Sequence, residues 1–178
     1  QAFWHLYHKK TQEVSLTLPA RMIFNELEIS RVELLGSDKY IGSKKNISEY
    51  LNQRSLNMHD KKSLNFLSYG ANLWLKSLAK FNLNDESVNI IQIFKEKYKL
   101  DKSSESIGDL LIQNIKDQEK FKKLSLKFLE KLDLYKDVSE EDEEIDAADS
   151  PGSTNDIENE DIEAESELSD SDENDSKD

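Results

Sequence analysis

Residues 20–36 of this chain have the sequence ARMIFNELEISRVELLG. Its apolar side chains recur every three or four residues, the spacing that places them on one face of an α-helix. Pro19 precedes the stretch and Gly36 closes it, the usual order of helix-starting and helix-ending residues. The stretch therefore predicts a helix over residues 20–35 with one face in a core. The residues on that face and its edges are Ile23, Phe24, Leu27, Leu34 and Leu35.

Five further segments repeat apolar residues with the same helical period. Asp60 is expected to cap the third helix, and Asn84 or Asp85 the fourth. Ser104 is expected to open the fifth, and residues 14–18 form at most a short extended piece. The pattern predicts an all-α bundle of five or six antiparallel helices with short connections. The apolar positions of the five segments are Ile47, Tyr50 and Leu51; Leu64, Leu67, Tyr69, Leu73, Trp74 and Leu78; Val88, Ile91, Phe94 and Tyr98; Ile107, Leu110, Leu111 and Ile115; and Phe121, Leu124, Phe128, Leu129 and Leu132.

The composition of the chain changes abruptly at residue 139. Residues 1–138 carry 23 Lys and Arg against 18 Asp and Glu, a net charge of +5. Residues 139–178 carry one Lys against 19 Asp and Glu, a net charge of −18, and no aromatic residue. Such a segment cannot bury enough apolar surface to offset the entropy of ordering it. The sequence therefore predicts a helical domain over residues 1–138 and an extended, disordered acidic linker over residues 139–178.

Composition and motifs exclude several classes of function. The chain has no cysteine, which removes disulfides, thiolate zinc sites and cysteine nucleophiles and fits the reducing cytoplasm. No apolar run reaches the roughly 18–20 residues that span a bilayer, so we expect no membrane partner. No Gly-rich phosphate loop or nucleophile elbow occurs, so no catalytic or cofactor-binding residue is assigned. The lysines are scattered and the linker is acidic, which argues against a nucleic-acid partner.

Two sets of residues resemble parts of a metal site. His5 and His8 lie three residues apart with Glu13 beyond them, but no further ligand is spaced to complete a site. Surface or interface histidines are the simpler interpretation. Near the C-terminus, Asp170 and Asp172 fit the start of a calcium loop, but the glycine that such a loop requires is absent. We therefore assign no metal ligand.

Charged residues on the helix of residues 20–35 form the strongest candidate site. Glu28 and Arg31 are three residues apart, and Glu33 follows across Val32. Three interpretations are open: a solvated, salt-bridged helix face, a docking patch for another protein, or a buried network within the chain. The surrounding apolar residues leave this helix few exposed faces, which favours the buried network over docking.

The same stretch resembles the N-terminal region of CobT, a subunit of the aerobic, ATP-dependent cobaltochelatase. That family carries the block A-R-x-x-F-D-x-L-E-x-x-R-V-E-x-L-G, which residues 20–36 match with Asn25 in place of the aspartate. A Tyr-His pair precedes the block in the family, and Tyr7-His8 matches it here. The residues that the resemblance marks as partner-binding or structural are Glu28, Arg31, Glu33, Gly36, Gly42 and Asn46.

Further segments follow in the same order as in that family. Gly42 and residues 46–47 match a glycine and an Asn-Leu pair. Residues 117–121 are similar to a D-Q-x-x-F segment, and residues 128–134 to L-L-x-x-L-D-L. An acidic linker then follows, as it does here, whereas residues 53–105 match the family poorly.

The resemblance implies a non-catalytic subunit of an oligomeric complex. It would dock on a ring of AAA+ ATPase subunits (CobS-like) and act with it on the large subunit (CobN-like), which inserts cobalt into the corrin ring in cobalamin synthesis. The complex would use ATP, Mg and cobalt, and this chain would bind no cofactor itself. The family continues after its linker into a von Willebrand factor A domain with a D-x-S-x-S metal site. We therefore expect this chain to be a fragment, truncated at its N-terminus, with that domain downstream.

Two other functions fit the same sequence. The chain could belong to an AAA+ and von Willebrand pair that remodels a client unrelated to cobalamin. It could also be a stand-alone protein-interaction module with an acidic tail. The gene sequence beyond Asp178 discriminates between them, because a D-x-S-x-S motif there supports the CobT-like interpretation and a stop codon supports the stand-alone module.

Overall fold

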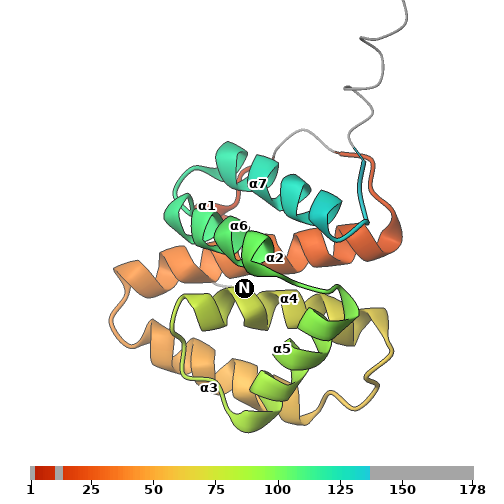
Figure 1. Cartoon of the computed structure of the whole chain (residues 1–178). Coiled ribbons are helices and arrows are strands. Elements are labelled where there is room, and N and C mark those ends of the chain that lie inside the picture. Colours follow the sequence, from red (N-terminus) through yellow and green to blue (C-terminus); the bar gives the residue numbers. More distant parts are fainter. Residues whose placement is uncertain (1–2, 11–13, 137–178) are drawn as a thin grey trace, which may run out of the picture. The chain divides into compact units, whose positions relative to one another are not determined.

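The computed structural model describes residues 3–10 and 14–136, and within these ranges the chain forms seven helices and no strand (Figure 1). The predicted all-α fold is confirmed. The predicted acidic linker over residues 139–178 lies outside the described residues. The helices are α1 (Trp4–Tyr7), α2 (Leu18–Lys39), α3 (Ser43–Leu56), α4 (Leu64–Leu78), α5 (Asp85–Lys97), α6 (Lys102–Gln113) and α7 (Gln118–Lys131).

Helix α2 runs through the middle of the domain, and the other helices pack around it and around α4 (Figure 1). The contact between α2 and α4 is the most extensive of the fold. Helices α3 and α5 lie on one side of this pair, and α6 and α7 on the other. Residues 66–76 of α4 are buried without interruption, because neighbouring helices cover this helix on all sides.

Helix α2 continues past Gly36 to Lys39, so the prediction that Gly36 ends this helix is wrong. The helix begins at Leu18, and Pro19 stands in its first turn, where its missing N–H costs nothing. Residues 14–17, the described residues just before the helix, form no strand, and residue 18 is already helical. A Cβ atom at Gly36 would overlap the ring of Phe3, which lies against the helix backbone there. The glycine at position 36 therefore allows the Phe3 ring to pack against the helix and does not end the helix.

Helix caps differ from the predictions at two places. Asn84 caps α5 as one of the two predicted residues, but Ser63 and not Asp60 caps α4, accepting from the Phe66 N–H at 3.2 Å. Ser104 lies in the first turn of α6, and Asp101 caps that helix in a reciprocal capping box. The hydrogen bonds from Ser104 lower the pKa of Asp101 to about 2.

Three residues predicted on apolar faces are exposed instead. Tyr50, Val88 and Leu110 are 59%, 54% and 43% exposed. Small residues take the inward positions beside them, since Ser87 on α5 and Gly108 on α6 are buried. Serine at such a position lets two helices approach closely and bonds a carbonyl or a second hydroxyl, as Ser87 Oγ does with Ser55 Oγ at 2.7 Å. A hydrophobicity pattern does not register these small residues and selects larger residues near them on the same helix.

Within the described residues, no helix has both the length and the apolar character needed to cross a bilayer.

Three helices end with a non-glycine residue in the left-handed region. Lys80, Lys99 and Asp133 have φ angles of 59°, 51° and 56° and follow α4, α5 and α7. At each end the next N–H bonds a carbonyl five residues back, as Leu100 does with Lys95 at 3.0 Å. Glycine is the favoured residue at this position because other residues place Cβ too close to the following carbonyl oxygen.

We expect Lys99→Gly to increase the free energy of unfolding by about 0.5–1 kcal/mol, since it removes the strain of the left-handed conformation. The control is Gln92→Gly, an exposed position in the middle of α5, which should decrease stability by about 1 kcal/mol. Urea denaturation followed by circular dichroism measures both. A destabilised Lys99→Gly variant would show that this helix end is held by contacts of the lysine side chain.

Candidate functional site

Arg31 and Glu28 form a buried ion pair on the inward side of α2. Arg31 is 1% exposed. Its Nε donates to Glu28 Oε2 at 2.8 Å, and its Nη2 donates to Glu28 Oε1 at 2.7 Å. Both carboxylate oxygens are thus bound by one planar guanidinium, the strongest arrangement for such a pair. The structure places this predicted pair inside the domain and not on a solvated helix face.

The same guanidinium reaches two distant segments of the chain. Arg31 Nη2 donates to the carbonyl of Tyr7 at 2.8 Å, and Nη1 donates to the carbonyl of Ile115 at 3.1 Å. Tyr7 is the last residue of α1, and Ile115 lies in the connection between α6 and α7. The ring of Phe121 lies 6.0 Å from the guanidinium carbon. One side chain therefore joins α1 and the α6–α7 connection to α2.

The segment after α1 is fixed by side chains of α2 and α7. His8 Nδ1 lies 2.9 Å from Glu28 Oε1, and the His8 ring stacks on Trp4 with centroids 4.0 Å apart. Gln118 pairs with the backbone of Lys9, accepting from its N–H at 2.9 Å and donating to its carbonyl at 2.8 Å. The Tyr7-His8 pair of the sequence motif is thus directly bound to Glu28 and Arg31.

The two histidines considered as metal ligands have separate environments. His8 bonds Glu28, whereas His5 is exposed. Glu13 lies outside the described residues. Over residues 3–10 and 14–136, no group of three or more potential ligands is placed to hold a metal ion.

Glu33 does not join the Arg31 pair but forms a second buried pair with Lys76 of α4. Lys76 Nζ lies 2.7 Å from Glu33 Oε2 and 3.4 Å from the carbonyl of Ser30. Lys76 has no solvent exposure, and this burial lowers the pKa of its ammonium group, which the neighbouring Glu33 carboxylate partly offsets. The sequence grouped three charges that the structure divides between two faces of α2.

A third polar cluster joins α2, α3 and α4 and was not predicted. Glu26 accepts from Arg54 Nη2 at 3.0 Å and from Asn72 Nδ2 at 2.8 Å. The guanidinium of Arg54 lies over the ring of Tyr69, 3.9 Å from its centroid.

The sequence contained one indication of buried charge on α4. Lys76 is the only charged residue of this helix and stands within an apolar run. A lysine there requires an anionic partner on a neighbouring helix.

The remaining predicted site residues lie at the end of α2 and the start of α3. Gly36 contacts the Phe3 ring, as described above, and Phe3 also stacks on Tyr40 with centroids 5.4 Å apart. Gly42 has a φ of 84° and caps α3, a conformation that glycine adopts without strain. Asn46 is exposed, and its N–H bonds the Gly42 carbonyl at 3.1 Å. These residues shape a turn and do not take part in the buried pairs.

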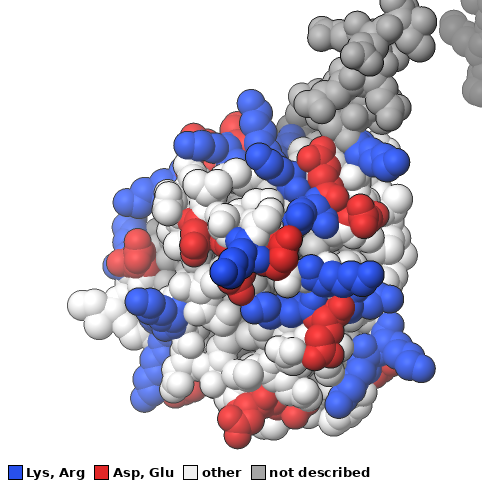
Figure 2. Space-filling model, viewed as in Figure 1, with Lys and Arg blue, Asp and Glu red and all other residues white. Residues whose placement is uncertain are grey.

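Two grooves flank α1, and their volumes are about 900 Å³ and 890 Å³. The first lies toward the α6–α7 connection and carries lysines on its rim, with Arg31 and Tyr7 among its lining residues. The second lies between α1, α2 and α3, and most of its lining is aromatic or aliphatic, with Tyr50 at its edge. On the face seen in Figure 2, lysines and arginines are interspersed with carboxylates and form no continuous basic stripe.

The geometry of these groups fits a structural role. Glu26, Glu28 and Glu33 each bond a cationic side chain, and those cations are Arg54, Arg31 and Lys76. The three pairs and the further hydrogen bonds of Glu26 and Arg31 connect α2 to four other parts of the fold, which are α1, α3, α4 and the α6–α7 connection.

We expect Arg31→Ala to destabilise the domain by about 3–5 kcal/mol, because it leaves Glu28 as a buried charge without its main partner. Arg31→Lys should also destabilise it, because an ammonium group lacks the planar set of donors with which the guanidinium binds Glu28 and both carbonyls. The control is Lys45→Ala, which removes an exposed pair with Glu49 and should cost less than about 1 kcal/mol. Thermal and urea denaturation measure all three, and a near-wild-type Arg31→Ala variant would contradict this role.

Burial raises the pKa of Tyr69 to about 12 from 10.0, and its hydroxyl donates to the Leu51 carbonyl at 2.8 Å. The pKa is higher in the folded state than in the unfolded state, so the neutral hydroxyl stabilises the fold below pH 10. This contribution of about 2–3 kcal/mol is lost as the pH rises from 10 to about 12. We expect the stability difference between wild type and Tyr69→Phe to shrink over that range. Urea titrations at several pH values test it, and a constant difference would contradict the assignment.

No protein-family model, curated protein or solved structure matches this chain.

Proposed function

We propose that this chain is the helical docking module of a CobT-like subunit, a non-catalytic part of a cytoplasmic, ATP-dependent cobaltochelatase. Its partners are a CobS-like AAA+ ring and a CobN-like large subunit. ATP, Mg and cobalt are used by those partners and not by this chain. The module would transmit the movement of the ATPase ring to the subunit that carries the corrin.

One observation supports this proposal above the others. Several of the residues that carry the resemblance form contacts that hold the domain together. Glu28 and Arg31 bind each other, and Glu28 Oε1 also lies 2.9 Å from Nδ1 of His8, a residue of the matching Tyr-His pair. Gly36, the last residue of the block, receives the Phe3 ring. A chance match to a sequence pattern gives no reason for its separate parts to meet in space.

The architecture also suits a part that transmits force. Movement passes through a domain only if its helices do not slide past one another. Helix α2 is fixed to α1 and to the α6–α7 connection by Arg31, to α4 by Glu33, and to α3 and α4 by Glu26. Each bond is buried or half-buried, which protects it from screening by salt.

The test is reconstitution with the AAA+ subunit encoded in the same genome. We expect the two purified proteins to form a complex in size-exclusion chromatography, and ATP turnover to require the AAA+ subunit. Addition of the large subunit and a corrin substrate should give cobalt insertion, followed by absorbance, that depends on this chain.

The outcomes separate the candidate functions. Complex formation without cobalt insertion would favour a remodelling pair with another client. Absence of any complex, in every nucleotide state and with the downstream part of the gene included, would contradict the proposal and favour a stand-alone interaction module. A natively folded variant with an exposed change, such as Lys61→Glu, serves as the control for nonspecific charge effects.

A further inference from the structure

We infer that residues 3–10, which we call the α1 strap, open independently of the rest of the domain and cover a binding site for a segment of a partner protein. The site, which we call the seat, is formed on α2 by Glu28, Arg31 and Gly36. The partner's segment presents an aromatic side chain, a main-chain carbonyl one helical turn later and then a hydrogen-bond donor, as the strap does. The inference rests on the function proposed above for the partner's identity, whereas the strap and its seat are argued from contacts and burial.

The α1 strap contains the one helix without a buried residue among those that the structure describes. Helix α1 has four residues, and Leu6 within it is 62% exposed. A helix of this length is unstable by itself, because ordering its first turn costs more than its few hydrogen bonds return. Regions with few buried apolar contacts open locally at a lower free energy than the whole domain. We therefore expect the strap to open while α2 and α4 remain folded.

One polar group is unfavourable in the closed strap. The hydroxyl of Tyr7 is buried and has no hydrogen-bond partner among the described residues. A buried hydroxyl without a partner has lost its hydrogen bonds to water, and opening the strap restores them. This cost partly offsets the bonds that hold the strap closed.

The seat defines the chemistry of its occupant through three contacts. These are the Phe3 ring on the Gly36 backbone, the Tyr7 carbonyl on Arg31 Nη2 and His8 Nδ1 on Glu28 Oε1. When the strap opens, Arg31 loses an acceptor and Glu28 loses a hydrogen-bond partner, beside a glycine that is no longer covered. A segment that supplies a carbonyl, a donor and an aromatic ring in this order restores all three contacts. The strap itself shows that such a segment fits.

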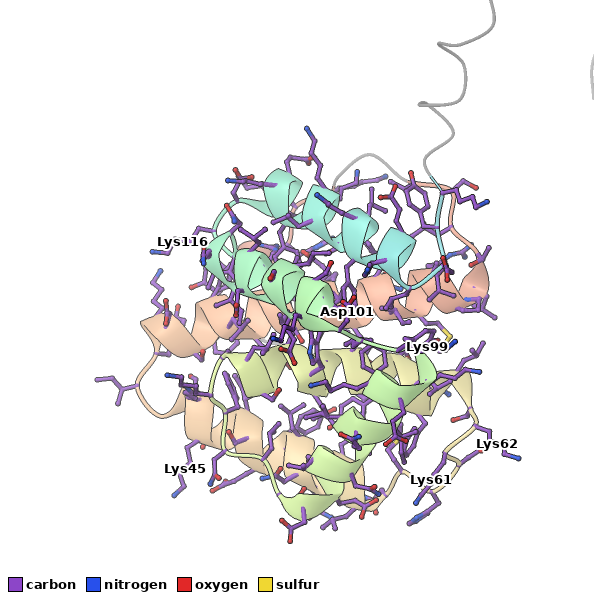
Figure 3. The ribbon with its side chains drawn as sticks, in the orientation of Figure 1. Lys45, Lys61, Lys62, Lys99, Asp101 and Lys116 are labelled. Atoms are coloured by element: carbon purple, nitrogen blue, oxygen red, sulfur yellow. The ribbon has the colours of Figure 1, made fainter. Side chains whose placement is uncertain are left out.

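Opening of the strap also joins the two grooves that flank it. The strap supplies part of the wall of each groove, at Leu6 and Tyr7 for the first and at Trp4 and His5 for the second. Lys116, which Figure 3 labels in the α6–α7 connection, also lines the first groove. Between the grooves the strap lies on α2. Without it, the grooves form one surface along α2 that a peptide segment longer than the strap can contact.

Hydrogen exchange of the full chain, followed by NMR, tests whether the strap opens. The reporters are the amides of Leu6, Tyr7 and His8, which bond carbonyls of residues 3 and 4. We expect their protection to be at least about tenfold lower than that of Leu73, a buried residue inside α4. Equal protection would show that the strap opens only when the whole domain unfolds, and this would overturn the inference.

Two variants test what holds the strap. Phe3→Ala removes the ring from Gly36 and should speed exchange of the strap amides several-fold, with Leu73 changed by less than about twofold. The matched control is Leu6→Ala, which shortens an exposed side chain of the same segment and should change exchange by less than about twofold. Circular dichroism must show both variants folded. Strap exchange in Phe3→Ala at the wild-type rate would contradict the assigned seat.

The seat is tested with a fluorescent synthetic peptide of the strap sequence, FWHLYHKK, added to the full chain. It should bind Phe3→Ala at least about fivefold more tightly than wild type, because the variant's own strap occupies the seat for less of the time. A peptide with alanine in place of its phenylalanine should not bind. Absence of binding by the strap peptide, or equal binding to wild type and variant, would overturn the inference.

Binding of the purified AAA+ subunit, measured by calorimetry, tests the partner's identity. If the subunit takes the seat, it should bind Phe3→Ala several-fold more tightly than wild type and bind Leu6→Ala like wild type. If it binds all three alike, or Phe3→Ala more weakly, the inference is overturned and the proposed function stands. If it binds none of them but the strap peptide binds as expected, the proposed function fails and the strap and seat stand. A dimer of the full chain in sedimentation that Phe3→Ala abolishes would overturn the inference, since the occupant would be the strap of a second copy.

Discussion

The arrangement of this domain depends on one buried guanidinium. Arg31 neutralises Glu28 and donates to carbonyls at the end of α1 and in the α6–α7 connection. Buried ion pairs gain little net free energy over apolar residues of the same shape, because desolvation offsets their attraction. Their value lies in specificity, since any arrangement that separates Arg31 from its partners leaves buried charges and carbonyls without hydrogen bonds. The pair selects one way of packing helices that apolar contacts alone would hold less selectively.

The apolar pattern was enough to predict the fold class and most of the helices. Leu27, Phe94 and Phe128 recur with a helical period in the sequence and are fully buried in the structure. The pattern failed where side-chain size and not hydrophobicity decides what faces inward. Buried Ser87 and Gly108 allow close helix contact, whereas Val88 and Leu110 on the same helices are exposed. The prediction that Gly36 ends α2 was wrong for the same reason, because the sequence does not show that an aromatic ring from a distant segment lies against this glycine.

Only those contacts of the candidate site that join residues close together in the sequence could be predicted. Glu28 and Arg31 are one turn apart on a helix, so their pairing followed from sequence. The partner of Glu33 is 43 residues away on α4, and that of Glu26 is 28 residues away on α3. No local pattern encodes such pairings, because they depend on which faces of separate helices meet. The isolated charge of Lys76 in an apolar helix indicated that a partner existed without indicating which one.

Arg31 also binds the two distant segments through main-chain oxygens and not through side chains. A carbonyl oxygen is present whichever amino acid occupies its position. Mutation at positions 7 and 115 can therefore alter the side chain and keep the bond, provided that the backbone follows the same path. Substitution of Arg31 or Glu28 has no such alternative. The evolutionary consequence is an uneven constraint, in which one short helical motif must persist while the segments that it fastens are free to diverge.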